Sequence, residues 1–312
     1  MYERRLEGKP GPWTTNPILA SYRFTNVFRA ADRVSQYLIS EIQYRPHRSQ
    51  APAEVFFRTL LFKLFNKIDT WEAIERELGS ISYQNADFNE LDRVLERASQ
   101  TRPIYSAAYI MPPPKLGHAR KHTNHLSLLR MMMEDGLPAK VERARSLQGV
   151  YDLLAPYPGL GPFLAFQFTI DLNYSSIVEF EEDEFVVAGP GALDGIAKCF
   201  QGVGKRSAAE IIFEMVDVQE REFQQRDLKF GGLFGRRLKP IDCQNLFCEI
   251  SKYARVAHPE VPGKANRTRI KQTYRADRAP LPSPVFPPRW ALIPPPASQL
   301  TRPAFEQLQL WG

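Results

Sequence analysis

The sequence predicts a mainly α-helical protein. Apolar residues recur at three- and four-residue steps in long runs without Gly or Pro, such as residues 18–42 and 53–66, and this is the period of a helix that buries one face. Alternation typical of strands is rare. From Pro280 to Pro303 prolines are dense and no periodicity survives, which is typical of a disordered or polyproline tail.

Helices are expected in a regular series along the chain. The run 53–66 is apolar almost all round, which predicts a helix buried on several sides, and Thr70 is a candidate N-cap for the next helix. The triplet Pro112–Pro114 breaks the chain. The expected helices are residues 18–42, 53–66, 70–78, 88–98, 103–111, 118–133, 142–154, 162–172, 190–200, 207–219 and 242–254.

Composition indicates an intracellular protein with a polyanionic partner. The 312 residues carry a formal net charge of +6, and 43% of them are hydrophobic, enough for a substantial core. The three cysteines suit a reducing compartment and are fewer than the four of a cysteine-ligated iron–sulfur cluster. The first residues lack the apolar core of a signal peptide, and no later run could span a bilayer. We therefore expect a cytoplasmic protein without membrane contact.

The stretch Leu153–Ala165 contains a Pro-Gly-Leu-Gly turn between two helical runs. Gly159 and Gly161 allow a sharp turn, and Pro162 suits the first position of a helix because its missing N–H would be unpaired there. Exposed amides at a helix start form an anion site. The stretch predicts either a plain helix–helix turn or a hairpin, about residues 144–172, that grips a DNA phosphate.

Polar residues inside otherwise apolar runs are the first candidate site residues. If residues 18–42 form one helix, four polar side chains share a face, either solvated or turned inward to hold a ligand. Within the apolar helices, a buried carboxylate such as Asp171 needs a partner or a role. The residues singled out in this way are Asn26, Arg29, Asp32, Arg33, Arg58, Asn66, Gln167 and Asp171.

One further segment is rich in glycine, and another contains three closely spaced histidines. Gly189-Pro190-Gly191 begins a second helix but lacks the Gly-Lys-Ser/Thr ending of a nucleotide P-loop. His118, His122 and His125 are spaced to share a helix face, yet no nearby Cys or carboxylate in the sequence completes a zinc set. We therefore expect no metal and no cofactor.

Five stretches stand out together: Tyr22–Arg33, Phe57–Asn66 with Thr70-Trp71, the hairpin into Asp171, Gly189–Ala192 and Cys248–Tyr253. Their order and spacing resemble the thymine-hypermodification family described as alpha-glutamyl/putrescinyl-thymine pyrophosphorylases. The domain of this family is also called the helical domain of 5-hydroxymethyluracil DNA kinases. The resemblance covers roughly residues 16–275.

The resemblance implies a helical, helix–hairpin–helix DNA-glycosylase-like fold that binds double-stranded DNA, flips out a modified base and acts on it. Carried over by position, Glu249 and Lys252 join the candidate residues, although the last motif lacks two acidic residues found in relatives. The catalytic Asp of such glycosylases follows the hairpin, and the family spacing counted from Gly159 ends among the acidic residues 181–184. Asp183 and Asp171 are therefore rival catalytic candidates.

Three functions follow from the resemblance. The first is N-glycosylase excision of a modified pyrimidine, with a role in defence against phage. Excision should be monofunctional, because Phe163 occupies the position of a Schiff-base lysine. The second is base hypermodification, in which an amine displaces a pyrophosphate on a hydroxymethyl-pyrimidine. The leaving phosphates would then be stabilised by Arg23, Arg29, Arg33 and Lys252. The third is a DNA-binding module without catalysis. The absence of a kinase motif favours a stand-alone enzyme, so we expect excision.

These expectations divide the chain into three parts and leave the oligomeric state open. Residues 1–15 are expected to form a flexible arm, residues 16–275 the helical domain, and residues 276–312 the Pro-rich tail. The expected catalytic residues are Asp171, Asp183, Asn26 and Asp32, with Gln167, Asn66 and Glu249 in support. The expected DNA or phosphate contacts are Gly159, Gly161, Arg29, Arg33, Arg58, Gly189, Gly191 and Lys252.

Overall fold

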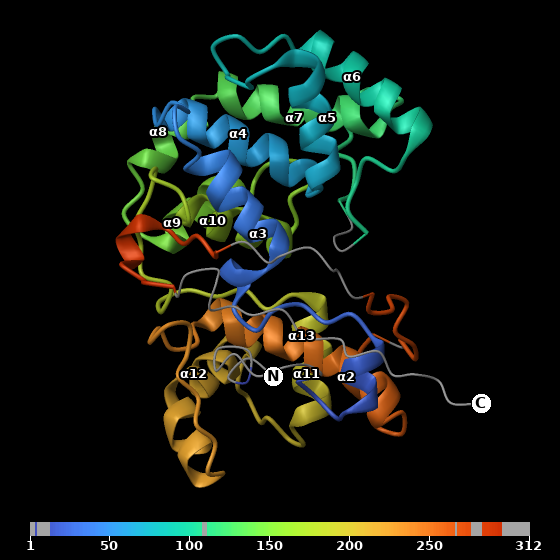
Figure 1. Ribbon diagram of the computed structural model, residues 1–312, viewed down its shortest axis with the longest axis vertical. Helices are drawn as coiled ribbons and strands as arrows, with labels where there is room; N and C mark the ends of the chain where they lie inside the picture. Colours follow the sequence, from blue (N-terminus) through green and yellow to red (C-terminus); the bar gives the residue numbers. More distant parts are fainter. Residues whose placement is uncertain (1–3, 5–12, 108–110, 266, 276–282, 295–312) are drawn as a thin grey trace, which may run out of the picture. The chain divides into compact units, whose positions relative to one another are not determined.

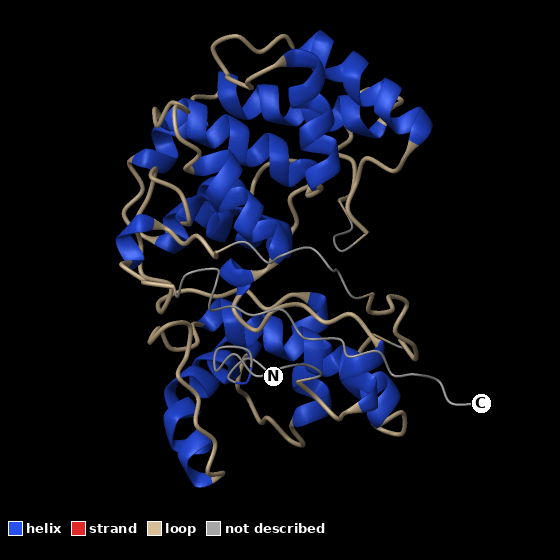
Figure 2. Ribbon diagram, in the orientation of Figure 1, coloured by secondary structure: helices blue, strands red, loops and turns tan. Residues whose placement is uncertain are grey.

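The computed structural model describes residues 4, 13–107, 111–265, 267–275 and 283–294 (Figure 1). All regular elements of these residues are helices, and pairing of extended segments is limited to two isolated β-bridges (Figure 2). The expectation of a mainly helical protein is confirmed. None of the described helices is long and apolar enough to cross a membrane.

The chain forms two compact units. Unit 1 consists of the described residues of Met1–Ala31, Ala188–Val285 and Ala291–Gly312, and unit 2 consists of Asp32–Val187 and Phe286–Trp290. Unit 2 is therefore inserted between two segments of unit 1.

Unit 2 is built around α4 (Pro52–Phe65), which is buried at every position from Glu54 to Phe65. This is what its apolar sequence predicts, and α5, α7, α8 and α10 all pack against it (Figure 1). The other helices of the unit are α3 (Arg33–Tyr37), η2 (Leu38–Gln43), α5 (Ile68–Leu78), α6 (Phe88–Thr101), α7 (Lys121–Glu134), α8 (Leu137–Glu142), α9 (Leu147–Leu154), α10 (Pro162–Asn173) and η3 (Pro288–Trp290).

Unit 1 has α11 (Pro190–Cys199) packed lengthwise on α13 (Pro240–Ala257), with α12 (Ala208–Gln225) against both (Figure 1). The short α2 (Pro17–Ser21) and the 3-10 turn η1 (Arg29–Ala31) also contact α13. The N-cap Ser207 of α12 forms a capping box with Glu210, the arrangement that starts a helix at that point.

A single helix over residues 18–42 is wrong: residues 18–21 and 33–42 are helical, in α2, α3 and η2, but the chain between them is not one helix. The chain leaves α2 at Tyr22, which forms an antiparallel bridge with Thr273, and residues 23–26 have no regular secondary structure. Asn26 Oδ1 accepts a hydrogen bond from the N–H of Phe28 at 3.0 Å, and Asp32 Oδ2 accepts one from the N–H of Val34 at 3.1 Å. Side-chain bonds of this kind to the nearby backbone compete with helix formation. The conformation of this segment therefore depends on its polar side chains and not on the spacing of its apolar residues.

Other expected helix bounds also differ from the structure. Residues 103–107 are not helical, and the helix expected from His118 begins at Lys121. The expected helix 142–154 is divided, because α8 ends at Glu142 and α9 begins at Leu147. Thr70 lies inside α5, whose N-cap is Lys67. Of the Pro-rich tail, residues 276–282 and 295–312 lie outside the described residues, whereas 283–294 include η3 with Phe286 buried beside it. Of the expected arm, the structure describes Arg4 and residues 13–15.

Candidate functional site

Asp171 is a fully buried carboxylate in α10 of unit 2. Its Oδ2 lies 3.3 Å from the Nζ of Lys63, which is 4% exposed, and the same ammonium donates a hydrogen bond to Asn66 Oδ1 at 2.7 Å. Asn66 ends α4 in the left-handed conformation, at φ 49°. Lys63 is thus the partner that a buried Asp171 requires, and this position favours a structural role over a catalytic one.

Two other polar candidates are buried in the same unit. The guanidinium of Arg58 donates to the carbonyl oxygens of Ile42 at 3.1 Å and Ser49 at 2.7 Å, and burial, with the neighbouring Arg48, lowers its pKa to about 10. Gln167 is 2% exposed on α10. Arg58 holds the loop before α4, so it is not placed as a surface contact for DNA.

Asp183 lies in the loop between α10 and α11 and is exposed, while its neighbour Glu182 is 3% exposed. The two catalytic rivals therefore differ sharply, because Asp171 is inaccessible and Asp183 faces solvent. No observation assigns catalysis to either.

The turn between α9 and α10 has the predicted shape. Gly159 has φ +84°, and a Cβ there would lie 3.3 Å from Pro114, so this position requires glycine. Gly161 is the N-cap of α10, with Pro162 at its first position and open space around its Cα. The expected grip of this turn on a DNA phosphate stays a prediction.

The four polar residues expected on one helix face are separated. Asn26 and Arg29 belong to unit 1, whereas Asp32 and Arg33 belong to unit 2. Arg29 is 3% exposed and its backbone N–H donates to Asp242 Oδ1 at 2.8 Å, while Asp32 caps α3. The prediction that these four residues share one helix face is therefore wrong, because they do not lie on one helix.

Glu249 and Lys252 of α13 hold the extended segment after α2. Glu249 Oε2 accepts from the N–H of Thr25 at 3.1 Å, and Lys252 Nζ donates to the carbonyl of Arg23 at 3.0 Å and to Glu249 at 2.7 Å. The ammonium of Lys252 also lies 5.0 Å from the ring centroid of Phe24. Two of the motifs that carry the family resemblance are thus in direct contact.

The glycines of α11 allow a close approach to α13. A Cβ at Gly191 would lie 3.0 Å from Cys248 Sγ, and a Cβ at Gly195 would lie 2.0 Å from the carbonyl oxygen of Phe247. Small residues four apart place two helix backbones side by side. Gly189 is the N-cap of α11. The structure thus gives Gly191 a packing role; its expected phosphate contact remains a prediction.

Sequence reasoning missed a buried polar network in unit 1. Asp194 of α11 accepts hydrogen bonds from the hydroxyl of Ser251 and from the N–H of Ala265, and Lys198 Nζ lies 3.4 Å from it. Burial alone would raise the pKa of Asp194, but these three groups together lower it. Asp194 is the acidic residue of the expected helix 190–200, and only its three-dimensional neighbours identify it as buried.

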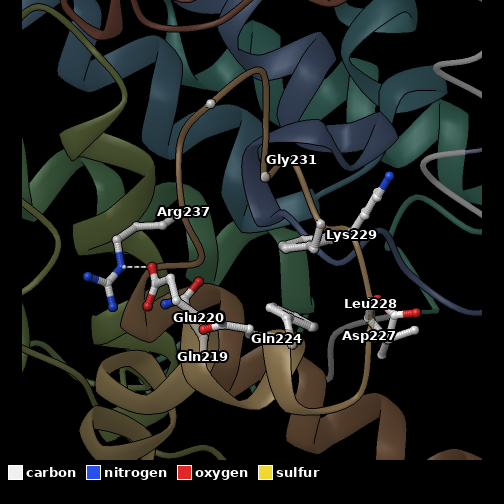
Figure 3. A pocket seen from close by; sticks show the side chains of 12 residues that line it. Gln219, Glu220, Gln224, Asp227, Leu228, Lys229, Gly231 and Arg237 are labelled. Carbon is white, nitrogen blue, oxygen red and sulfur yellow. Dashed lines mark ion pairs between the residues drawn. The ribbon is translucent and has the colours of Figure 1, made fainter.

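Two exposed features of α12 were missed as well. The turn before it, residues 201–207, carries Gly202 at φ 68°, Gly204 at φ 64° and the exposed Lys205. At its other end a cleft of about 450 Å³ lies between α12 and the segment 228–237 (Figure 3). The paired glycines and Ser207 in the sequence could have indicated the turn, but nothing in it indicates a cleft.

The three histidines have separate surroundings. His118 precedes α7 and is exposed, His122 Nε2 lies 3.4 Å from Glu96, and His125 is buried between the hydroxyl of Tyr105 and the carbonyl of Pro112. Among the described residues no group of three His, Cys, Asp or Glu side chains is arranged to hold a metal ion.

Comparisons with known proteins match almost the whole helical region. Residues 1–263 match the family model "5-hmdU DNA kinase, helical domain". A 5-hmdU DNA kinase of Bacillus phage SP10 is 25% identical over 302 residues, which cover 88% of this chain and 46% of the relative. The chain thus spans just under half the length of that protein. No solved structure matches.

These findings confirm the family resemblance and correct the expected function. The relative is named a kinase, which transfers a phosphate, and neither it nor the family model describes a glycosylase, a hydrolase or a helix–hairpin–helix protein. N-glycosylase excision is therefore contradicted. The alternative expectation, modification of a 5-hydroxymethyl-pyrimidine in DNA, is closer to the findings.

Proposed function

Because the chain belongs to the family of 5-hmdU DNA kinase helical domains, we propose that it binds DNA containing 5-hydroxymethyluracil and supports modification of this base. The observation that carries the proposal is the family match over residues 1–263, which takes in every described helix from α2 to α13. The chain covers just under half of the phage kinase. The proposal therefore assigns it DNA binding and base presentation, and leaves phosphate transfer to be measured.

Charge supports DNA as the partner. The formal net charge is +6, and phosphate contacts by Lys and Arg supply most of the affinity of proteins for DNA. The turn 201–207 presents Lys205 and Arg206 to solvent between two helices. Arg206 is paired with Glu214, whereas the ammonium of Lys205 has no hydrogen-bond or ion-pair partner in the described part of the chain. We propose Lys205 as a DNA backbone contact.

The test measures binding of the full chain to two duplexes that differ only in 5-hydroxymethyluracil or thymine at one position. We expect tighter binding to the modified duplex. Lys205→Ala should weaken binding to both duplexes by a similar factor and reduce the salt slope by about one. Arg76→Ala, which removes an equal charge from the exposed side of α5, is the matched control and should change neither.

The same duplexes are then incubated with ATP, with and without the chain, and their nucleosides are analysed by mass spectrometry. A modified base whose mass has increased by one phosphate would show that this chain is sufficient for transfer. Equal affinity for the two duplexes, together with an unchanged base, would contradict the proposal.

A further inference from the structure

A cleft at the C-terminal end of α12 is lined only by residues of unit 1. Its volume of about 450 Å³ falls within the range of sites that bind small molecules. Figure 3 shows Lys229 and Arg237 on opposite sides of it, with Gln219 and Gln224 on α12 between them.

One wall of the cleft is aromatic. The rings of Phe223 and Phe230 lie 4.7 Å apart, and Phe230 stacks on Phe28 at 5.9 Å with an angle of 5° between the planes. Phe28 is 1% exposed, so this wall is held by the core of the unit. Nucleobases stack readily on aromatic rings presented in this way.

The segment that follows Phe230 is a glycine-rich turn that also lines the cleft. Gly232 has φ +65°, and a Cβ there would lie 2.3 Å from the carbonyl oxygen of Arg236, so no other residue fits. Gly231 and Gly235 also line the cleft. A backbone without side chains allows close approach of a ring.

The charges around the cleft balance. Glu220 lies 3.3 Å from Arg237, and this pair leaves Asp227 and Lys229, whose side chains have no partner among the described residues. Two carboxylates against two cations would not favour a triphosphate. They suit a neutral ligand with hydrogen-bonding edges, because a carboxylate accepts and an amide both donates and accepts.

A pyrimidine of the uracil type has these properties. Its ring N–H is a donor for the carboxylate of Asp227, and its carbonyl oxygens are acceptors for the amide of Gln224. We propose that this cleft receives the 5-hydroxymethyluracil base after it is flipped out of the duplex. The identity of the base rests on the proposed function, whereas the planar ring and its polar edge rest on the cleft. Flipping costs a few kcal/mol, which stacking and these bonds offset.

The direct test titrates the ¹⁵N-labelled full chain with the nucleoside 5-hydroxymethyl-2′-deoxyuridine. We expect amide shifts within residues 219–237, and about tenfold weaker binding for Gln224→Ala and Asp227→Asn. Asn tolerates the positive φ of 50° at Asp227, so the backbone is kept. The matched controls Gln225→Ala and Asp217→Asn, exposed on the same helix outside the cleft, should bind as the wild type does. No binding at millimolar nucleoside, or shifts only elsewhere, would overturn the inference.

A second measurement separates this inference from the proposed function. Duplexes carrying 2-aminopurine beside 5-hydroxymethyluracil or thymine report base flipping by fluorescence. If the wild type prefers the modified duplex and both cleft variants keep that preference and the fluorescence change, the cleft inference is wrong and the proposed function stands. If the nucleoside binds the cleft but the duplexes are not distinguished, the proposed function fails and the cleft remains a nucleoside site.

Discussion

The carboxylate of Asp171 and the ammonium of Lys63 form an ion pair 3.3 Å apart at exposures of 0% and 4%. Removing one partner from such a pair leaves an uncompensated buried charge, which is costly, whereas replacing both with apolar groups is often neutral. The pair links α4 to α10, so its effect should be on folding.

Lys63→Met or Asp171→Asn should each lower the free energy of unfolding by about 3–5 kcal/mol. The double variant Lys63→Met/Asp171→Leu should lose less than the sum, since no charge is left without a partner. Urea unfolding at neutral pH measures the three values. Asp152→Asn, exposed on α9, is the control and should stay within about 0.5 kcal/mol of the wild type. An unchanged midpoint for Lys63→Met would contradict a structural pair.

His125 makes stability depend on pH. Burial lowers its pKa to about 4, and its ring nitrogens lie 2.7 Å from the hydroxyl of Tyr105 and 3.1 Å from the carbonyl of Pro112. The unfolded chain, with an ordinary histidine pKa near 6.5, therefore binds more protons than the folded chain between these values. The folded state loses stability as the pH falls from about 6.5 towards 4, by up to about 1.4 kcal/mol per pH unit from this group.

Urea unfolding at several pH values between neutral and acidic should show this slope in the wild type and in His118→Gln, because His118 is exposed. His125→Gln should reduce the slope of the unfolding free energy against pH by the contribution of about one bound proton. Burial also lowers the pKa of His122, so some slope should remain. Equal slopes in the wild type and His125→Gln would contradict this account.

Which polar residues are structural could not be read from the sequence. It identified Asp171 as needing a partner, but the partner is Lys63 on another helix, and no local spacing relates the two. Asn26 and Asp32 looked like members of one helix face because they fit its period, yet both bond the backbone two residues ahead. Short polar side chains that compete with the helix are the physical reason for this error.

At the scale of elements, α11 and α13 show why glycine position matters. Gly191 and Gly195 are four apart on the face of α11 that meets Cys248 and Phe247. At Gly195 the two helix backbones lie so close together that no residue with a Cβ fits.

Gly195→Ala should destabilise the protein by about 3 kcal/mol, because its Cβ would lie 2.0 Å from the carbonyl oxygen of Phe247 and the two backbones must separate. Gly149→Ala in α9 is the matched control. Its Cβ would meet Ser146 Oγ, the N-cap oxygen of α9, at 3.3 Å, so this atom has to give by only a few tenths of an ångström, and alanine favours the helix. Thermal unfolding of both variants measures the difference. A Gly195→Ala protein as stable as Gly149→Ala would show that the helices are further apart.

Elements with strong local patterns were predictable, and those set by distant pairing were not. The apolar α4 and the Pro-Gly turn before α10 appear where the sequence places them. Residues 21–23 instead pair with 272–274 through the Tyr22–Thr273 bridge, so their conformation depends on a segment far along the chain. The cleft beside α12 is lined by Phe223 and Phe230, and Phe230 stacks on Phe28, a ring that only the folded unit brings to this place.

At the scale of the whole molecule, the chain order makes unit 2 an insertion in unit 1, and the segment 286–290 returns to unit 2. Arg289 donates to the carbonyl oxygens of Asn173, the last residue of α10, and of Val178 in the loop after it, the latter at 3.0 Å. The ring of Trp290 meets that of Tyr174 edge-on at 5.6 Å. A segment near the end of the sequence therefore caps a helix formed by its middle.

Arg289→Ala should remove two charge-assisted hydrogen bonds to carbonyls at the end of α10, each worth about 1.5–3 kcal/mol in buried settings and less here because the side chain is partly exposed. Native-state hydrogen exchange should then show faster exchange of the amides of residues 170–180, while α11 and α13 keep their protection, since they belong to the other unit. Arg76→Ala, on the exposed side of α5 in the same unit, serves as the control for loss of a positive charge. Equal exchange near α10 in both variants would mean that residues 286–290 rest on the unit without stabilising it.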